Sequence, residues 1–178
     1  MLEIEELGRR IMICGPSNGG KSTLASALGR RLNIPAVHLD LLHHRMHTDW
    51  EPLPREEFEA NHAAAIAGDS WAMEGNYFAL MPARLERATG VILVGSSPLP
   101  ALLRYFRRTL FQRDRPGDIG YGRDRIKWEL IHMILFVQPK KRARDLALLT
   151  ASGLPMVTLR SMRELNAYYR FWSLDRNR

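Results

Sequence analysis

Five short apolar segments, each closed by turn-forming residues, alternate along the chain with longer segments of helical periodicity. The strand-like segments cover residues 10–14, 34–39, 71–73, 90–94 and 155–159, and the helical patterns cover residues 21–32, 55–67, 99–111, 125–137, 140–151 and 162–172. Strands that alternate with helices of this length imply crossover connections and a parallel sheet covered on both faces. We therefore predict an α/β fold, a single three-layer α/β/α domain over residues 1–178 built on a five-stranded parallel sheet.

The polar residues that close the predicted strands are the first candidates for a functional site. Ligands of parallel α/β sheets bind at the carboxyl ends of the strands, where the loops gather. These positions are held here by Gly15, Asp40, Glu74, Ser96, Arg160 and Ser161. The sequence thus directs attention to one edge of the sheet.

The segment between the first strand and the first helix reads Gly-Pro-Ser-Asn-Gly-Gly-Lys-Ser and matches the phosphate-loop pattern G-x-x-x-x-G-K-[ST] at every fixed position. Its glycines let backbone N–H groups turn inward at a helix N-terminus, where the helix dipole also favours a phosphate. A chance glycine turn is the alternative, and the flanking strand and helix patterns argue against it. The predicted nucleotide-binding residues are Gly15, Pro16, Ser17, Asn18, Gly19, Gly20, Lys21, Ser22 and Thr23.

Four side chains of this loop have distinct expected roles. Lys21 reaches the β- and γ-phosphates of a nucleoside triphosphate, and Ser22 supplies a hydroxyl to Mg²⁺. Ser17 and Asn18 lie where side chains can contact the transferring phosphate. A dinucleotide-binding fingerprint does not fit, because its glycine spacing differs and a lysine would have no role in it.

Two acidic residues close the second and third predicted strands. Asp40 is predicted to orient or deprotonate an acceptor hydroxyl, with a helix N-cap as the alternative. Glu74 falls where an acid would hold Mg²⁺ through water, with an ordinary surface glutamate as the alternative. Further residues predicted to line the acceptor pocket, together with Asp40, are Asn76, Tyr77 and Arg84.

Histidines gather between Asp40 and Trp50. His43 and His47 are four residues apart, a spacing that can bind zinc on a helix. No third ligand is placed convincingly, so a polar helix that covers the acceptor site is the preferred interpretation over a structural zinc site.

Basic residues concentrate in the second half of the chain, which changes the meaning of the net charge of +7. Residues 1–98 hold nine Lys and Arg against twelve Asp and Glu, whereas residues 99–178 hold seventeen against seven. Arg104 and Arg108 share one helix face, and we predict that they clamp the charge on a transferring phosphoryl group. The glycine-containing stretch at about 112–124 is predicted to be a lid that excludes water.

A nucleic-acid surface is the alternative for the same arginines, because Tyr105, Phe106 and Phe111 lie among them. These aromatic residues recur at helical spacing with leucines of the same segment, which instead predicts that they face a core. The leucines are Leu102, Leu103 and Leu110.

The compartment is expected to be the cytoplasm. The single cysteine, Cys14, cannot form an intramolecular disulfide, and the N-terminal residues are acidic rather than those of a secretory signal. No apolar run approaches the ~18 residues that cross a bilayer, so no membrane association is expected. Both a monomer and a homodimer fit the sequence.

With these residues in place, the sequence resembles the P-loop nucleoside monophosphate kinase-like proteins, which are related to adenylate kinase, and within them the group named DNA topology modulation proteins. The resemblance rests on GPSNGGKSTLA, the strand end His38-Leu-Asp40, the Trp71-to-Tyr77 segment, Leu103-Arg104-x-x-Arg107-Arg108, Trp128-Glu129 and Leu159-Arg160-Ser161. It implies an adenylate kinase-like P-loop NTPase fold with an arginine-rich helical lid. It further implies ATP at Gly15 to Thr23, an adenine-side loop near Arg160 and Ser161, Mg²⁺ at Ser22, and lid arginines at Arg104 and Arg108.

The chain departs from this group at two places. Glu74 stands where the group typically has aspartate, and Ser96-Ser97-Pro98 stands where the fourth strand usually ends in Asp-x-Pro.

The expected function is that of a Mg²⁺-dependent kinase that transfers the γ-phosphate of ATP to a nucleoside, a nucleotide or another small hydroxyl compound. The alternative is a nucleotide-binding regulator that contacts DNA through the basic second half.

Overall fold

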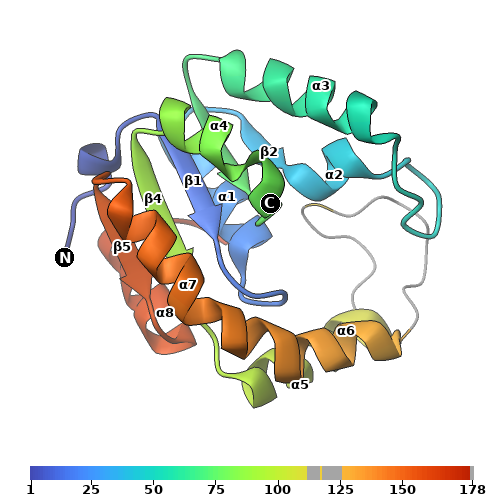
Figure 1. Cartoon of the computed structure of the whole chain (residues 1–178). Helices are drawn as coiled ribbons and strands as arrows, with labels where there is room; N and C mark the ends of the chain where they lie inside the picture. Colours follow the sequence, from blue (N-terminus) through green and yellow to red (C-terminus); the bar gives the residue numbers. More distant parts are fainter. Residues whose placement is uncertain (112–116, 118–125, 177–178) are drawn as a thin grey trace.

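A five-stranded, all-parallel sheet runs through the computed structural model of this chain, with the strand order β2-β3-β1-β4-β5 (Figure 1). The strands are β1 (Arg10–Cys14), β2 (Ala36–His38), β3 (Trp71–Glu74), β4 (Gly90–Val94) and β5 (Met156–Leu159). The structure describes residues 1–111, 117 and 126–176, except for the side chains of Arg108 and Arg142. The predicted α/β class and five-stranded parallel sheet are confirmed.

Helices cover both faces of the sheet (Figure 1). They are α1 (Lys21–Leu32), α2 (Leu39–His43), α3 (Arg55–Ala67), α4 (Met81–Arg87), α5 (Pro98–Phe111), α6 (Trp128–His132), α7 (Gln138–Ala151) and α8 (Met162–Phe171), with 3-10 turns η1 (Glu5–Leu7) and η2 (Phe78–Leu80) and a π-helical segment η3 (Met133–Val137). The chain crosses from β1 to β2 in one direction and from β3 to β4 in the other. Right-handed crossovers in opposite directions place α1 and α4 on opposite faces.

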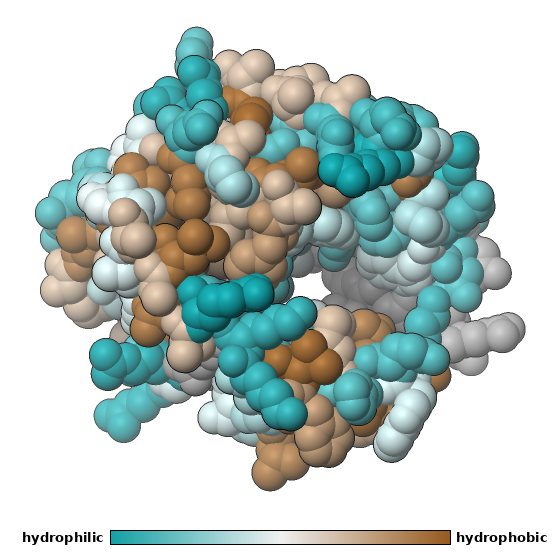
Figure 2. All heavy atoms as spheres, in the orientation of Figure 1, coloured by the Kyte–Doolittle hydropathy of each residue, from teal (hydrophilic) through white to brown (hydrophobic). Residues whose placement is uncertain are grey.

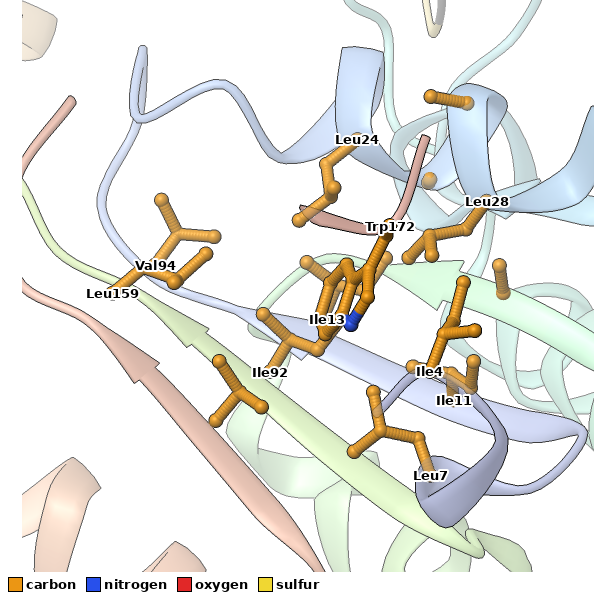
Figure 3. Packing of buried hydrophobic residues seen from close by; sticks show 14 of the residues in the cluster. Ile4, Leu7, Ile11, Ile13, Leu24, Leu28, Ile92, Val94, Leu159 and Trp172 are labelled. Atoms are coloured by element: carbon orange, nitrogen blue, oxygen red, sulfur yellow. The ribbon is translucent and has the colours of Figure 1, made fainter. Parts of the chain in front are cut away.

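The two faces of the sheet carry separate hydrophobic cores because successive strand residues point to opposite sides. In β1, Ile11 and Ile13 belong to one core, whereas Met12 and Cys14 belong to the other. The first core packs against α1 and α8, with the Trp172 ring beside the β-strands (Figure 3). The second core packs against α3, α4 and α7.

A third, smaller cluster joins α5 to η3 and is built on Ala101, Tyr105 and Ile134. The prediction that the aromatic residues and leucines of α5 face a core is confirmed for Tyr105. It is wrong for Leu103, Leu110 and Phe111, which are exposed. An α-helix has 3.6 residues per turn, so only one stripe of its side chains faces the cluster. Side chains at the other positions point to solvent. Apolar atoms accordingly show at the surface in the lower part of Figure 2.

Several element boundaries differ from those predicted. Strand β2 is shorter than 34–39, and the predicted helix 125–137 is divided into α6 and η3. Helix α4 was not predicted, because its seven residues are too few for a clear period. The predicted lid range 112–124 lies outside the described residues except for Gly117. Within the part of the chain that is described, no helix has the length and apolar character needed to span a bilayer.

Helix α3 presents a histidine to the core. Phe58, His62 and Ile66 follow one another at four-residue intervals, and all three are buried. The His62 Nε2 atom has no hydrogen-bond partner among the described residues. Burial, together with the nearby positive charge of Arg84, lowers the pKa of His62 to about 4. The imidazole is therefore neutral in the folded protein at neutral pH.

We expect this histidine to make the fold sensitive to mild acid. The unfolded chain takes up the His62 proton near its ordinary pKa of 6.5, whereas the folded chain resists protonation down to about 4. As the pH is lowered between these two values, the free energy of unfolding should decrease by up to ~1.4 kcal/mol per pH unit. Urea denaturation at pH 7 and pH 5 measures the loss, which should be about 2 kcal/mol larger in the wild type than in His62→Leu. A pH dependence that is the same in both proteins would contradict this prediction; the exposed His132→Leu serves as the control.

Candidate phosphate-binding and acceptor site

The carboxyl ends of all five strands meet at one edge of the sheet, as parallel pairing requires. Glu74 at the end of β3 is in register with His38 of β2 and Ile13 of β1. On the other side of β1, the Gly95 N–H donates to the carbonyl of Leu159. The loop that follows β1 therefore lies among the ends of its neighbours, and Figure 1 shows it extending between α2 and α7.

The backbone of the glycine-rich loop adopts conformations that favour glycine and asparagine over other residues. Gly15 and Gly20 have φ values of 141° and 94°, and Asn18 has a φ of 59°. A Cβ built on Gly15 would lie 2.1 Å from the carbonyl oxygen of Val94, so no larger residue fits there. Gly20 precedes the first residue of α1, so the loop ends at a helix N-terminus as the motif predicts.

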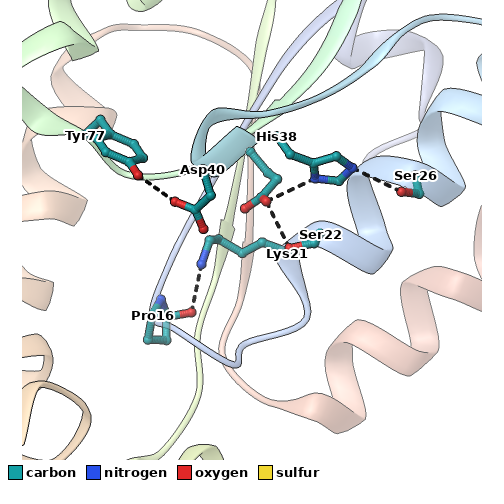
Figure 4. Close-up of polar contacts among 8 residues, drawn as sticks. Pro16, Lys21, Ser22, Ser26, His38, Asp40 and Tyr77 are labelled. Carbon is teal, nitrogen blue, oxygen red and sulfur yellow. Dashed lines mark hydrogen bonds and ion pairs between the residues drawn. The ribbon is translucent and has the colours of Figure 1, made fainter. Parts of the chain in front are cut away.

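Lys21 folds back along this loop. Its Nζ atom donates to the Pro16 carbonyl at 3.0 Å, and the Gly19 N–H donates to the same oxygen at 3.2 Å. Figure 4 shows the Lys21 side chain extending from the start of α1 between Asp40 and Pro16. The ammonium group is thus held over the loop by a weak neutral acceptor, for which a phosphate oxygen is a stronger substitute.

A buried polar cluster connects the loop to β2 and β3. The Ser22 hydroxyl donates to Glu74 Oε1 at 2.9 Å, and His38 Nδ1 lies 3.1 Å from the same oxygen. The other ring nitrogen of His38 lies 3.5 Å from the hydroxyl of Ser26 (Figure 4). Burial on its own raises the pKa of the Glu74 carboxyl, which is 4% exposed. His38, Lys21 and Ser22 together outweigh burial and lower that pKa, so the group is an anion at neutral pH.

Asp40 lies in the first turn of α2, not at its N-cap, which is His38. The Tyr77 hydroxyl donates to Asp40 Oδ1 at 2.6 Å and lies 3.4 Å from His43 Nδ1. Burial, with the nearby Asp40 charge, raises the pKa of Tyr77 well above its usual value, so the phenol remains a donor. Tyr77, a residue predicted to line the acceptor pocket, therefore orients the carboxylate of Asp40, the residue predicted to act on the acceptor hydroxyl.

Asn76 and Arg84 have a different role from the predicted lining of an acceptor pocket. Both polar ends of the Asn76 side chain bond to the backbone of Gly15, each at 3.0 Å. The Arg84 guanidinium is fully buried and donates to the carbonyls of Gly75, Asn76 and Tyr77. The polar atoms of these two side chains that form hydrogen bonds therefore bond to the backbone, and the two residues hold the shape of the site.

The two predicted clamp arginines differ in what is described of them. Arg104 donates from Nε to the Asn18 carbonyl at 2.7 Å and also bonds to the Ser96 hydroxyl. Burial lowers the pKa of Arg104. The backbone of Arg108 belongs to α5, but its side chain lies outside the described residues. Gly117, within the predicted lid range, lies beside the polar cluster, since a Cβ built on it would be 3.3 Å from His38 Nδ1.

The predicted adenine-side residues follow β5 and begin α8. The Ser161 hydroxyl accepts from the Glu164 N–H at 3.2 Å, and the Glu164 carboxylate accepts from the Arg160 N–H at 2.7 Å. This reciprocal pair is a capping arrangement that stabilises the helix start. The Arg160 side chain is exposed, and Leu165 in the next turn lies 3.2 Å from a Cβ built on Gly20.

The four-residue spacing of His43 and His47, which left a zinc site as the less favoured alternative, does not lie on one helix. Helix α2 ends at His43, and His47 has a φ of 62° in the following turn. The His43 ring instead stacks edge-on against His44 and Phe58. Over the described ranges, no group of three or more His, Cys, Asp or Glu residues is placed to hold a metal ion.

Sequence reasoning missed two residues of the site. His38 is named above only as part of the strand end His38-Leu-Asp40. The signal that could have identified it is a histidine at the carboxyl end of a strand, where polar side chains are candidates for the site. Gln138, the first residue of α7, donates from Nε2 to the Ser17 hydroxyl at 3.0 Å. No local pattern indicates this contact, because the two residues are 121 positions apart. Thr23, which was predicted to bind nucleotide, lies in the first turn of α1.

Sequence similarity to characterised proteins adds no assignment to this site. No protein-family model matches the chain, and no curated protein is similar enough to count as a relative. The residues described above are therefore the basis on which the function is inferred.

Proposed function

We propose that this chain is a Mg²⁺-dependent, ATP-binding phosphotransferase of the P-loop nucleoside monophosphate kinase-like type, acting on a small hydroxyl-bearing acceptor. The proposal rests chiefly on one observation. A glycine-rich loop opens α1 with its lysine held over it, and the hydroxyl that follows the lysine bonds to a buried carboxylate on the neighbouring strand. An adenylate kinase-like fold is compatible with the five-stranded parallel sheet.

The loop fits a polyphosphate. Its backbone turns through Gly15, Asn18 and Gly20 with positive φ values and leads into the N-terminus of α1, where the helix dipole adds positive potential. Lys21 adds a full positive charge that can transfer from the Pro16 carbonyl to phosphate oxygens. Arg104, bonded to the Asn18 carbonyl, adds a second charge at the middle of the loop.

The residues at Ser22 and Glu74 also fit Mg²⁺. Both donor atoms are oxygens, the ligand type that Mg²⁺ prefers, and they lie 2.9 Å apart. A nucleotide-bound Mg²⁺ takes few protein ligands and keeps several waters, so a cluster of three acidic or histidine side chains is not required. Mg²⁺ held there would neutralise charge that builds up on the transferring phosphate.

The acceptor side is formed by Asp40 with Tyr77. In the proposed reaction an acceptor hydroxyl oxygen forms a bond to the γ-phosphorus, and the bond from phosphorus to the β–γ bridging oxygen breaks, so ADP leaves. The acceptor proton passes to Asp40, whose carboxylate is oriented by the Tyr77 hydroxyl. Positioning and charge stabilisation supply most of the catalysis in such transfers.

The direction of Arg104 favours this function over the DNA-binding alternative. A nucleic-acid surface needs its arginines on the outside, where they meet a phosphate backbone. Arg104 instead points inward, to the Asn18 carbonyl and the Ser96 hydroxyl. A half-buried guanidinium bonded to the phosphate loop supports a role in binding nucleotide phosphates.

The function is tested by a screen for acceptor-dependent ADP release. The protein is incubated with ATP and Mg²⁺, and nucleosides, nucleotides and small hydroxyl compounds are added one at a time. We expect one class to raise ADP release above the rate with ATP alone. Asp40→Asn should abolish that increase while leaving ATP binding intact, because the change affects only the acceptor side. Failure of the wild type to bind ATP in calorimetry would overturn the proposal.

A further inference from the structure

Gln138 brings a side-chain amide to the phosphate loop from outside the sheet. It is the first residue of α7, and its Nε2 lies 3.0 Å from the Ser17 hydroxyl oxygen. The other end of the amide, Oε1, is buried and has no hydrogen-bond partner among the described residues. Oδ1 of Asn18, the neighbour of Ser17 in the loop, is buried and unpartnered in the same sense.

Such an arrangement is costly unless a ligand completes it. A buried polar atom that has lost its water and gained no partner destabilises the fold. An amide can resolve the conflict by rotating, because it carries two N–H donors at one end and an acceptor at the other. If the Ser17 hydroxyl donates to Oε1 of Gln138, the amide N–H groups occupy the buried position now taken by that oxygen. They can then donate to an anion.

The helix that carries Gln138 is shaped to bring it to the loop. Pro139 follows directly; it has no N–H, and its ring clashes with the carbonyl four residues earlier, that of Leu135. The widened π-helical turn η3 covers this carbonyl. A π-turn takes up about one residue more than an α-turn. Gln138 therefore occupies the position that Val137 would occupy in an uninterrupted α-helix. As a result, the side chain that faces the phosphate loop is an amide and not an isopropyl group.

We propose that Gln138 is a phosphate-binding residue, which donates from its side-chain amide to the terminal phosphate of a bound nucleoside triphosphate while Ser17 holds the other end of the amide. This inference rests on the proposed function and extends it. Ser17 and Asn18 are the loop residues expected nearest to the terminal phosphate, and Arg104 reaches the Asn18 carbonyl from the same layer of helices. The residue thus makes the site select a triphosphate over a diphosphate.

The test compares two nucleotides on the intact chain. Calorimetry measures the binding of Mg²⁺–ADP and of a non-hydrolysable ATP analogue, with nitrogen bridging the β- and γ-phosphates, to the wild type and to Gln138→Ala. We expect the variant to bind the analogue about tenfold to a hundredfold more weakly and ADP unchanged, as for the loss of a hydrogen bond to a charged group. Lys140→Ala, an exposed change in the same helix turn, should leave both affinities unchanged.

Two further variants separate this role from a structural one. Pro139→Ala keeps the amide but lets the helix regularise, so it should reproduce the selective loss of the analogue. Gln138→Glu places a carboxylate against the phosphate and should weaken analogue binding further while sparing ADP. Equal weakening of both nucleotides, or none, by Gln138→Ala overturns the inference. A wild type that binds neither nucleotide overturns the proposed function itself, and that outcome is distinct from a loss of selectivity.

Discussion

Replacement of Lys21 by alanine is expected to slow ATP turnover by about a hundredfold to a thousandfold. The Lys21 ammonium is bonded to the Pro16 carbonyl and has no carboxylate partner among the interactions described. It is therefore free to move to phosphate oxygens, whose negative charge grows in the transition state as the bridging bond breaks. A positive group held where this charge develops is worth several kcal/mol, and alanine removes it.

The measurement is steady-state ADP release at saturating ATP, with the acceptor that gives the largest stimulation of the wild type. Lys141→Ala is the matched control, because it removes the same charge from an exposed position on α7. Its turnover should equal that of the wild type. Lys21→Ala should unfold at nearly the wild-type urea concentration, since the lost hydrogen bond is partly exposed. Unchanged turnover in the folded Lys21→Ala protein would rule out the phosphate-loop assignment.

Local pattern was sufficient to predict the framework of the site. Helix α1 covers its predicted range because Leu24, Leu28 and Leu32 form an apolar stripe at four-residue spacing, and Asn33 ends it in a left-handed conformation. Strands β1 and β4 match their predicted ranges because, apart from Arg10 at the start of β1, both are continuous apolar runs, as strands buried on two faces are. Parallel pairing then brings Glu74 to the loop, so the contact with Ser22 follows from the fold class and one strand end.

Contacts between distant segments were not predictable in the same way. Arg84 is predicted to line the acceptor pocket because it follows the third strand, yet α4 turns its guanidinium inward to backbone carbonyls. The backbone direction of a seven-residue helix is set by packing, which no periodic pattern records. Gln138 reaches Ser17 only because η3 widens the helix before it. Tertiary geometry of this kind decides which polar side chains line a site and which support it.

Arg84 supports the site through a short series of contacts. Its guanidinium fixes the backbone of residues 75–77, Asn76 then holds Gly15 at the start of the phosphate loop, and Tyr77 holds Asp40. Burial lowers the pKa of Arg84, but the ordinary value of 12.5 is so high that the group remains charged at neutral pH. Its positive charge is stabilised by the dipoles of the Gly75, Asn76 and Tyr77 carbonyls. Loss of the guanidinium would remove hydrogen bonds to three carbonyls at once, and it would leave the buried carbonyl of Gly75 without this donor.

Arg84→Met is therefore expected to lower the free energy of unfolding by about 3 kcal/mol or more, a large part of the ~5–15 kcal/mol typical of a domain. Urea denaturation measures the loss. The matched control is Arg87→Met, one turn later in α4, whose guanidinium also donates to two backbone carbonyls, those of Ile66 and Ala67. Arg87 is exposed, so water can replace it and the loss should stay below about 1 kcal/mol. If the two variants are equally stable, Arg84 does not hold the loop and strand ends together, and the site must owe its shape to the sheet alone.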